Sequence, residues 1–173
     1  MIMKKRLIAA SIGAAFAASS TLGLAREPVN LPVTNVFGAQ GQLNGVDTTG
    51  AGTLNVGNNQ NINTSNDPGG AVTSNANNTA NILFGGSSTV TGFTGSNLIR
   101  FLSISAGAPG TIVNFNGPVF ATAFNVNGTG TVNFNGNALA AAGLTFAGDG
   151  FVTFGSGVTL TGAIFTNTAG REL

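Results

Sequence analysis

The sequence predicts an all-β fold, a parallel β-helix or β-solenoid with coils of about 20 residues, from three observations. Glycine recurs every 20 residues from Gly110 to Gly170. Each repeat opens with a short run of alternating polar and apolar residues that ends in phenylalanine, at Phe115, Phe134 and Phe154. Asn and Gly separate three such extended runs in every repeat. A right-handed helix is the default for parallel crossovers.

The first 25 residues have the organisation of a cleavable signal peptide. Met1 to Arg6 is basic, Leu7 to Ala25 carries no charge, and Gly23-Leu24-Ala25 provides a small-x-small cleavage site. We expect cleavage after Ala25 and export of the remainder. An uncleaved membrane anchor is the alternative, because the uncharged stretch approaches the roughly 20 residues that span a bilayer.

Charge and cysteine content exclude several classes of partner. After cleavage the chain keeps three arginines (Arg26, Arg100 and Arg171) and five acidic residues, a formal net charge of −2. Nucleic acid is therefore not an expected partner, since its binding depends on Lys and Arg that neutralise phosphates. The chain has no Cys, so neither disulfides nor thiolate metal sites stabilise it.

Residues 26–107 are expected to form an irregular N-terminal cap followed by degenerate β coils. Pro28 and Pro32 disfavour a regular start, and residues 55–81 are rich in Asn, Gly and Ser, which predicts irregular coils or a long surface loop. The strand candidates are 53–56, 82–84, 89–91 and 98–104.

Residues 108–173 are expected to form regular coils that end without a cap. Parallel stacking about 4.8 Å apart brings residues at equal offsets into ladders along the axis. The expected inward rows are Val113, Val132 and Val152, then Phe115, Phe134 and Phe154, and the expected outward row is Asn114, Asn133 and Thr153.

Three further rows follow in each repeat. They are Phe124, Leu144 and Ile164; Val126, Phe146 and Thr166; and Phe120, Leu139 and Leu160, the last with a one-residue slip in the middle repeat. The turns between runs are expected to place Gly or Asn at positive φ. They are Asn116-Gly117, Asn127-Gly128, Asn135-Gly136 and Gly148-Asp149-Gly150. Asn-Gly also favours β-hairpins, so an antiparallel meander competes, but it would not produce the 20-residue repeat.

The last residues predict an open end. Gly170 begins a fourth repeat that stops after Arg171-Glu172-Leu173. An uncapped coil exposes strand edges and apolar side chains, which is an aggregation hazard. We therefore expect a piece of a longer protein, a truncated reading frame, or a chain that needs a partner at this end.

The signal peptide and Asn/Gly/Thr-rich coils such as Gly-Thr-Val-Asn-Phe-Asn-Gly (130–136) resemble the passenger regions of bacterial autotransporters, in particular rickettsial surface cell antigens. The resemblance covers roughly residues 80–170. It implies export to the outer membrane or cell surface, or secretion, and a role in adhesion to host cells or matrix, or in surface coating. It also implies an outer-membrane β-barrel translocator. No segment after Gly170 supplies that barrel, so the translocator is expected as a separate partner.

Catalytic, cofactor and metal sites are not expected. The chain contains no His, Cys or Tyr, and its only Asp residues are Asp47, Asp67 and Asp149. This inventory opposes a polysaccharide-active enzyme, which needs two carboxylates at a fixed separation. Calcium is also not expected, because Gly148-Asp149-Gly150 has no Asp in its sister turns. The threonine pairs Thr89/Thr91 and Thr159/Thr161 are explained by β propensity.

Three functions remain open from the sequence. The first is a structural or adhesive surface protein, and the second is a truncated remnant of a longer autotransporter without activity of its own. The third is a self-assembling secreted subunit, favoured by an open coil end and by Asn ladders that can propagate cross-β stacking.

Overall fold

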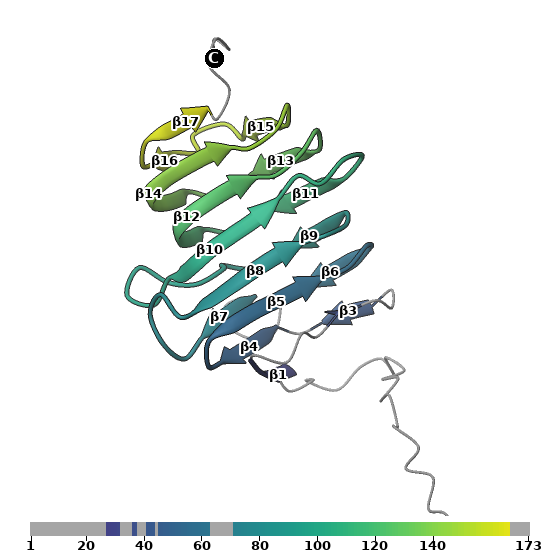
Figure 1. Ribbon diagram of the computed structural model, residues 1–173, viewed down its shortest axis with the longest axis vertical. Helices are drawn as coiled ribbons and strands as arrows, with labels where there is room; N and C mark the ends of the chain where they lie inside the picture. The colour runs from purple at the N-terminus through teal and green to yellow at the C-terminus, as the bar shows by residue number, and fades with distance from the viewer. Residues whose placement is uncertain (1–26, 32–35, 38–40, 44, 63–70, 167–173) are drawn as a thin grey trace, which may run out of the picture.

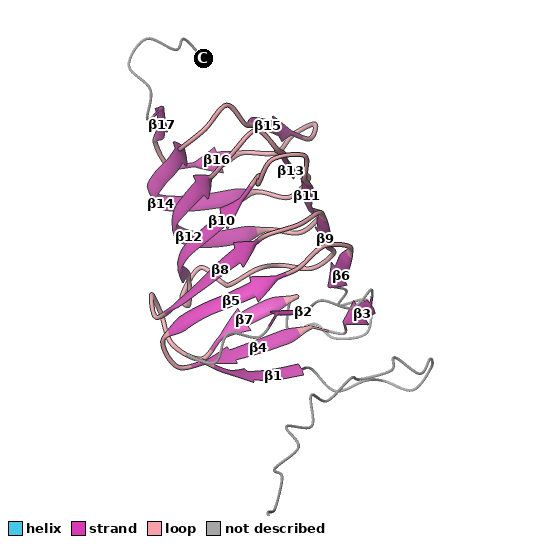
Figure 2. Cartoon of the chain, turned by 45° about the vertical axis from the view of Figure 1, so that its right-hand side comes forward, coloured by secondary structure: helices cyan, strands magenta, loops and turns pink. Residues whose placement is uncertain are grey.

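The computed structural model describes residues 27–31, 36–37, 41–43, 45–62 and 71–166. These residues are all-β and contain no helix, and their strands are parallel and stacked in sheets along one long axis (Figures 1 and 2). No helix in this part of the chain could therefore cross a membrane. The predicted signal peptide and Gly170 to Leu173 lie outside the described residues.

Seventeen strands are described, and most are short. They are β1 (Glu27–Asn30), β2 (Val36–Phe37), β3 (Gly41–Leu43), β4 (Val46–Thr49), β5 (Gly52–Val56), β6 (Gln60–Ile62), β7 (Val72–Ser74), β8 (Ala80–Phe84), β9 (Ser88–Val90), β10 (Phe101–Ala106), β11 (Ile112–Phe115), β12 (Val119–Val126), β13 (Thr131–Phe134), β14 (Ala138–Phe146), β15 (Phe151–Phe154), β16 (Leu160–Thr161) and β17 (Ile164–Thr166).

Through the first nine strands, consecutive strands enter three sheets in rotation, as in a solenoid. One sheet has the order β1-β4-β7, and single bridges through Thr94 connect it to the start of β12. A second has the order β2-β5-β8-β10-β12-β14, where β16 pairs with the start of β14 and β17 with its end. The third has the order β3-β6-β9-β11-β13-β15. The expected parallel β fold is thus observed at the level of all-β, parallel, stacked sheets.

The register between neighbouring strands follows the predicted spacing only in the C-terminal part. Asn133 lies 19 residues after its partner Asn114, and Thr153 lies 20 after Asn133. Toward the N-terminus the separation grows, to 25 residues between Thr89 and Asn114. Longer connections absorb the additional residues, so the ladders continue although the sequence period is lost.

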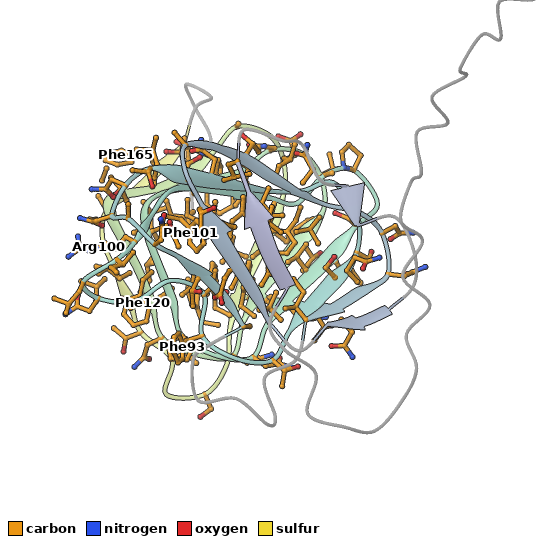
Figure 3. The ribbon with its side chains drawn as sticks, turned by 90° about the horizontal axis from the view of Figure 1, so that it is seen from below. Phe93, Arg100, Phe101, Phe120 and Phe165 are labelled. Carbon is orange, nitrogen blue, oxygen red and sulfur yellow. The ribbon has the colours of Figure 1, made fainter. Side chains whose placement is uncertain are left out.

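The interior contains the predicted aromatic stack. Phe115 and Phe134 are fully buried, and the ring of Phe134 lies 5.5 Å from each neighbour in the stack, Phe115 and Phe154, at 14° to both. Phe124 packs edge-on against Phe134 at 5.0 Å. Val113 and Val132 are also buried, so the predicted inward rows are confirmed. Seen along the axis, Phe101 lies inside the ring of strands (Figure 3).

The register also confirms two of the three further rows and corrects the third. Phe124 pairs with Leu144, and Leu144 with Ile164; the row two residues later follows in step. Phe120 pairs with Leu139 as predicted, but Leu139 pairs with Thr161 and not with Leu160. The prediction for Leu160 was wrong because the turn after Phe154 has five residues, whereas the turn after Phe134 has three.

The Asn-Gly turns use glycine for a different reason from the one predicted. Gly117 and Gly136 do not have positive φ. A Cβ on Gly117 would instead lie 2.4 Å from the carbonyl carbon of Gly92, and one on Gly136 would lie 2.4 Å from that of Gly117. The predicted positive φ is wrong here because stacked turns approach backbone to backbone, which only a residue without a side chain permits.

The strand candidates of the N-terminal part are largely confirmed. Residues 53–56 and 82–84 lie in β5 and β8, and 89–91 overlap β9. In the segment 98–104, β10 begins only at Phe101. The predicted irregular segment 55–81 contains two strands that the composition did not indicate, β6 and β7, because their alternation spans only three residues each.

Candidate functional site

The described acidic residues do not assemble a metal site. Within the described ranges no group of three or more His, Cys, Asp or Glu residues could hold a metal ion. Asp149 is exposed in the turn before β15, and Asp47 on β4 accepts a hydrogen bond from the Thr73 hydroxyl. Asp67 lies outside the described residues. The carboxylates considered in the sequence are thus distributed over separate elements.

Arg100 is the one Lys or Arg in the described part of the chain, and its backbone and side chain brace a corner. Its Nε donates to the carbonyl oxygen of Asn97 at 3.2 Å, and its backbone N–H donates to Oδ1 of Asn77 at 2.9 Å. It lies on the outside of the ring of strands (Figure 3). One braced cation does not form the basic patch that nucleic acid requires.

The sheet β3-β6-β9-β11-β13-β15 has a different character, because none of its strands contains Asp, Glu, Lys or Arg. Residues two apart on these strands face outward, as the alternating burial of β6, β9, β11 and β13 shows. One outward row runs the length of the sheet and is called the polar ladder here. Its members are Asn61, Thr89, Asn114, Asn133 and Thr153.

Side-chain hydrogen bonds connect the polar ladder from coil to coil. Nδ2 of Asn133 donates to Oδ1 of Asn114 at 2.7 Å, and the Thr153 hydroxyl donates to Oδ1 of Asn133. Nδ2 of Asn114 donates to Oγ1 of Thr89 at 3.4 Å. A chain of such bonds orients every amide in one direction, so the ladder is preorganised.

A hollow of about 420 Å³ lies over β6, β9 and β11 at the N-terminal half of this sheet. That volume falls in the range of small-ligand sites. No charged residue lines it, and its lining consists of Asn59, Gln60, Asn61, Ser87, Ser88, Thr89, Ile112 and Asn114.

Hydrogen bonds to backbone hold the walls of the hollow in place. The buried Gln60 donates from Nε2 to the carbonyl of Asn58 at 3.0 Å, and the buried Ser88 donates from its hydroxyl to the carbonyl of Gly57 at 3.2 Å. Ser87 Oγ accepts from the backbone N–H of Ile112 at 3.0 Å. The side chains above this framework therefore project from a fixed surface.

The sequence predicted the C-terminal half of the polar ladder but not its extension to Thr89 and Asn61. Only Asn114, Asn133 and Thr153 follow the spacing of about 20 residues. The missed signal is local: in Asn61-Ile62 and Thr89-Val90 a polar residue precedes a β-branched one, as Asn precedes Phe later. Of the two threonine pairs, Thr89 joins the ladder, whereas Thr161 belongs to the sheet of β14.

Comparison of the chain with family models, curated proteins and solved structures gives no match. The functional argument therefore depends on the geometry of the neutral sheet and on the residues that the sequence analysis identified.

Proposed function

We propose that this chain is an exported cell-surface protein whose β-helix has a structural or adhesive role, like the autotransporter passenger regions that it resembles. The observation that carries the proposal is the neutral sheet, whose polar ladder is hydrogen-bonded from Thr89 to Thr153. Such a surface is rigid and rich in hydrogen-bonding groups, and it has no group suited to acid–base or nucleophilic chemistry. Those properties suit contact with another surface.

The finer architecture belongs to the same proposal. We infer a right-handed β-helix with closed coils of about 20 residues, since parallel crossovers take this hand. The separations of 19 and 20 residues along the ladder support that coil length. A closed coil presents each sheet as one outer face, so a contact surface can extend along the axis by adding coils.

Export is supported by the first 25 residues. A basic start, an uncharged stretch and Gly23-Leu24-Ala25 before Arg26 are the three parts of a signal peptide. A separate outer-membrane translocator would carry the chain to the surface, as the resemblance implies.

The test is to express the chain in a Gram-negative host together with a candidate translocator and to locate it. N-terminal sequencing should give Arg26 as the first residue, and protease added to intact cells should degrade the protein. Purified chain should also bind saturably to wells coated with host cells or matrix. A product that retains residues 1–25 and stays protected inside the cell would contradict the proposal.

A second candidate, a self-assembling subunit, is favoured by the last described coil. Strands β15, β16 and β17 each pair on one side only among the described residues, and four large apolar side chains are exposed there. These are Phe151, Phe154, Ile164 and Phe165. Sedimentation over a concentration series should show fibres that Phe151→Lys suppresses if this candidate is right; monomers at every concentration would contradict it.

A further inference from the structure

We propose that the hollow over β6, β9 and β11 binds a neutral, polyhydroxylated ligand, a short segment of an uncharged glycan chain. The inference rests on the proposed adhesive function and names the chemical class of its partner.

The hollow presents a small grid of outward side chains on three adjacent strands. One row is Asn59, Ser87 and Ile112, and the second, two residues later, is Asn61, Thr89 and Asn114. Rows of this kind repeat about every 4.8 Å across strands and about every 6.7 Å along them. Hydrogen-bonding groups thus occur at regular intervals over a surface several sugar hydroxyls wide.

The grid offers both kinds of contact that a sugar ring needs. The exposed Asn59 and Asn61 make no hydrogen bond through their amides to the described residues, so each can donate to one hydroxyl and accept from another. Thr89 adds a hydroxyl in the second row. Ile112 is 51% exposed in the same hollow and supplies an apolar contact for the C–H face of a ring.

Neutrality excludes the main competing ligands. A phosphate, sulfate or carboxylate group is recognised by Arg, Lys or clustered backbone N–H groups, and no charged residue lines the hollow. A peptide cannot join as an added strand, because β6, β9 and β11 are each paired on both sides. Uncharged hydroxyl groups are the chemistry that remains matched to uncharged amides and hydroxyls.

The buried residues beneath the grid reinforce the argument. Gln60 and Ser88 occupy inward positions that Val113, Val132 and Val152 fill in later coils. Both are nine-tenths or more buried and bonded to the turn at Gly57 and Asn58. They fix the strand from which Asn59 and Asn61 project, and the regular C-terminal coils have no counterpart.

The experiment titrates the purified, isotope-labelled chain with four neutral oligosaccharides while NMR follows the side-chain amides. The probes are laminarihexaose, maltohexaose, cellohexaose and chitotetraose, and a heparin hexasaccharide serves as the charged comparator. At least one neutral probe should bind with millimolar or tighter affinity and shift the amide signals of Asn59, Asn61 and Asn114. Heparin should leave these signals unchanged.

Two variants and a matched control locate the site. Asn61→Ala and Thr89→Val should each weaken binding by about threefold to tenfold, the effect of one lost hydrogen bond. Thr153→Val removes a hydroxyl from the same polar ladder two coils beyond Asn114 and should leave the affinity unchanged. Circular dichroism of all three variants checks that the fold is intact.

Several results would overturn the inference: no neutral probe shifts the amides at millimolar concentration, heparin binds equally well, or Thr153→Val weakens binding as much as Thr89→Val. The titration uses purified chain, so it does not depend on export. A protein that reaches the surface and adheres to host cells without glycan affinity would refute this inference alone. A glycan-binding protein retained in the cytoplasm would refute the proposed function alone.

Discussion

Replacing Phe134 with alanine should reveal how strongly the interior aromatic stack holds the coils together. The ring of Phe134 is fully buried and lies between Phe115 and Phe154, at 5.5 Å from each, with Phe124 edge-on at 5.0 Å. Its removal leaves a cavity between consecutive coils. Because close-packed interiors relax only partly around such cavities, the loss combines transfer and cavity terms.

The matched variant is Phe154→Ala in the next coil. Phe154 occupies the same row but is 40% exposed, and its described ring contact is with Phe134 alone. We expect Phe134→Ala to reduce the free energy of unfolding by about 3–5 kcal/mol. Phe154→Ala should reduce it by about 1–2 kcal/mol, since only part of the ring leaves water on folding.

Urea unfolding followed by far-UV circular dichroism measures the difference, because the chain has no Trp or Tyr for fluorescence. With a slope near 2 kcal/mol/M, the midpoint should fall by about 1.5–2.5 M for Phe134→Ala and by about 0.5–1 M for Phe154→Ala. Equal shifts in the two variants would refute the interior stack, since equal burial would then be required.

Three further predictions test separate features of the structure. Gly117→Ala should lower the free energy of unfolding by about 1–3 kcal/mol, because its Cβ would lie 2.4 Å from the Gly92 carbonyl carbon. Thermal melting checks this against Gly85→Ala, whose Cβ would lie 3.8 Å from its nearest described neighbour and should be tolerated; equal melting points would refute the close approach. Asn133→Ala removes one donated and one accepted ladder bond and should lower the stability by about 1–2 kcal/mol in urea, whereas Asn135→Ala, which loses one exposed bond, should shift it by less. Addition of EGTA should leave the melting temperature unchanged, because the described turns place a single Asp149 where a calcium row needs several carboxylates; a fall in melting temperature would contradict this.

The sequence was most informative where the repeat is regular. Val and Phe two residues apart, with Asn between them, predicted which side chains of β11, β13 and β15 face inward, and the register confirms it. That success has a physical cause: parallel stacking places equal offsets side by side, so an interior Phe favours another Phe above it.

Prediction failed where the connections vary in length. Thr89 and Asn114 are separated by 25 residues although they are direct partners, so no fixed period could align them. The row of Leu160 was misplaced for the same reason, since two additional turn residues shift the strand that follows. Strand pairing is decided by side-chain burial and hydrogen bonding, which tolerate loops of different lengths.

The candidate site depended on those same variable connections. Asn59, Ser87 and Ile112 have no common sequence motif, and only the register of β6, β9 and β11 brings them into one row. Composition did indicate that the site would be uncharged, because the chain contains few charged residues. The location of the hollow required the structure.

The parallel register of the polar ladder is the central claim, and a disulfide test addresses it most directly. The chain has no native Cys, so Asn114→Cys combined with Asn133→Cys introduces the only thiols. Direct partners in adjacent strands lie about 4.8 Å apart, within the range that a disulfide bridges. Asn114→Cys combined with Thr153→Cys places the thiols two coils apart, at about 10 Å, which exceeds the limit of about 7 Å. Mass spectrometry after mild oxidation should find an intramolecular disulfide in the first variant and free thiols in the second. Free thiols in the first variant, or a disulfide in the second, would contradict the register on which the polar ladder and the glycan site depend.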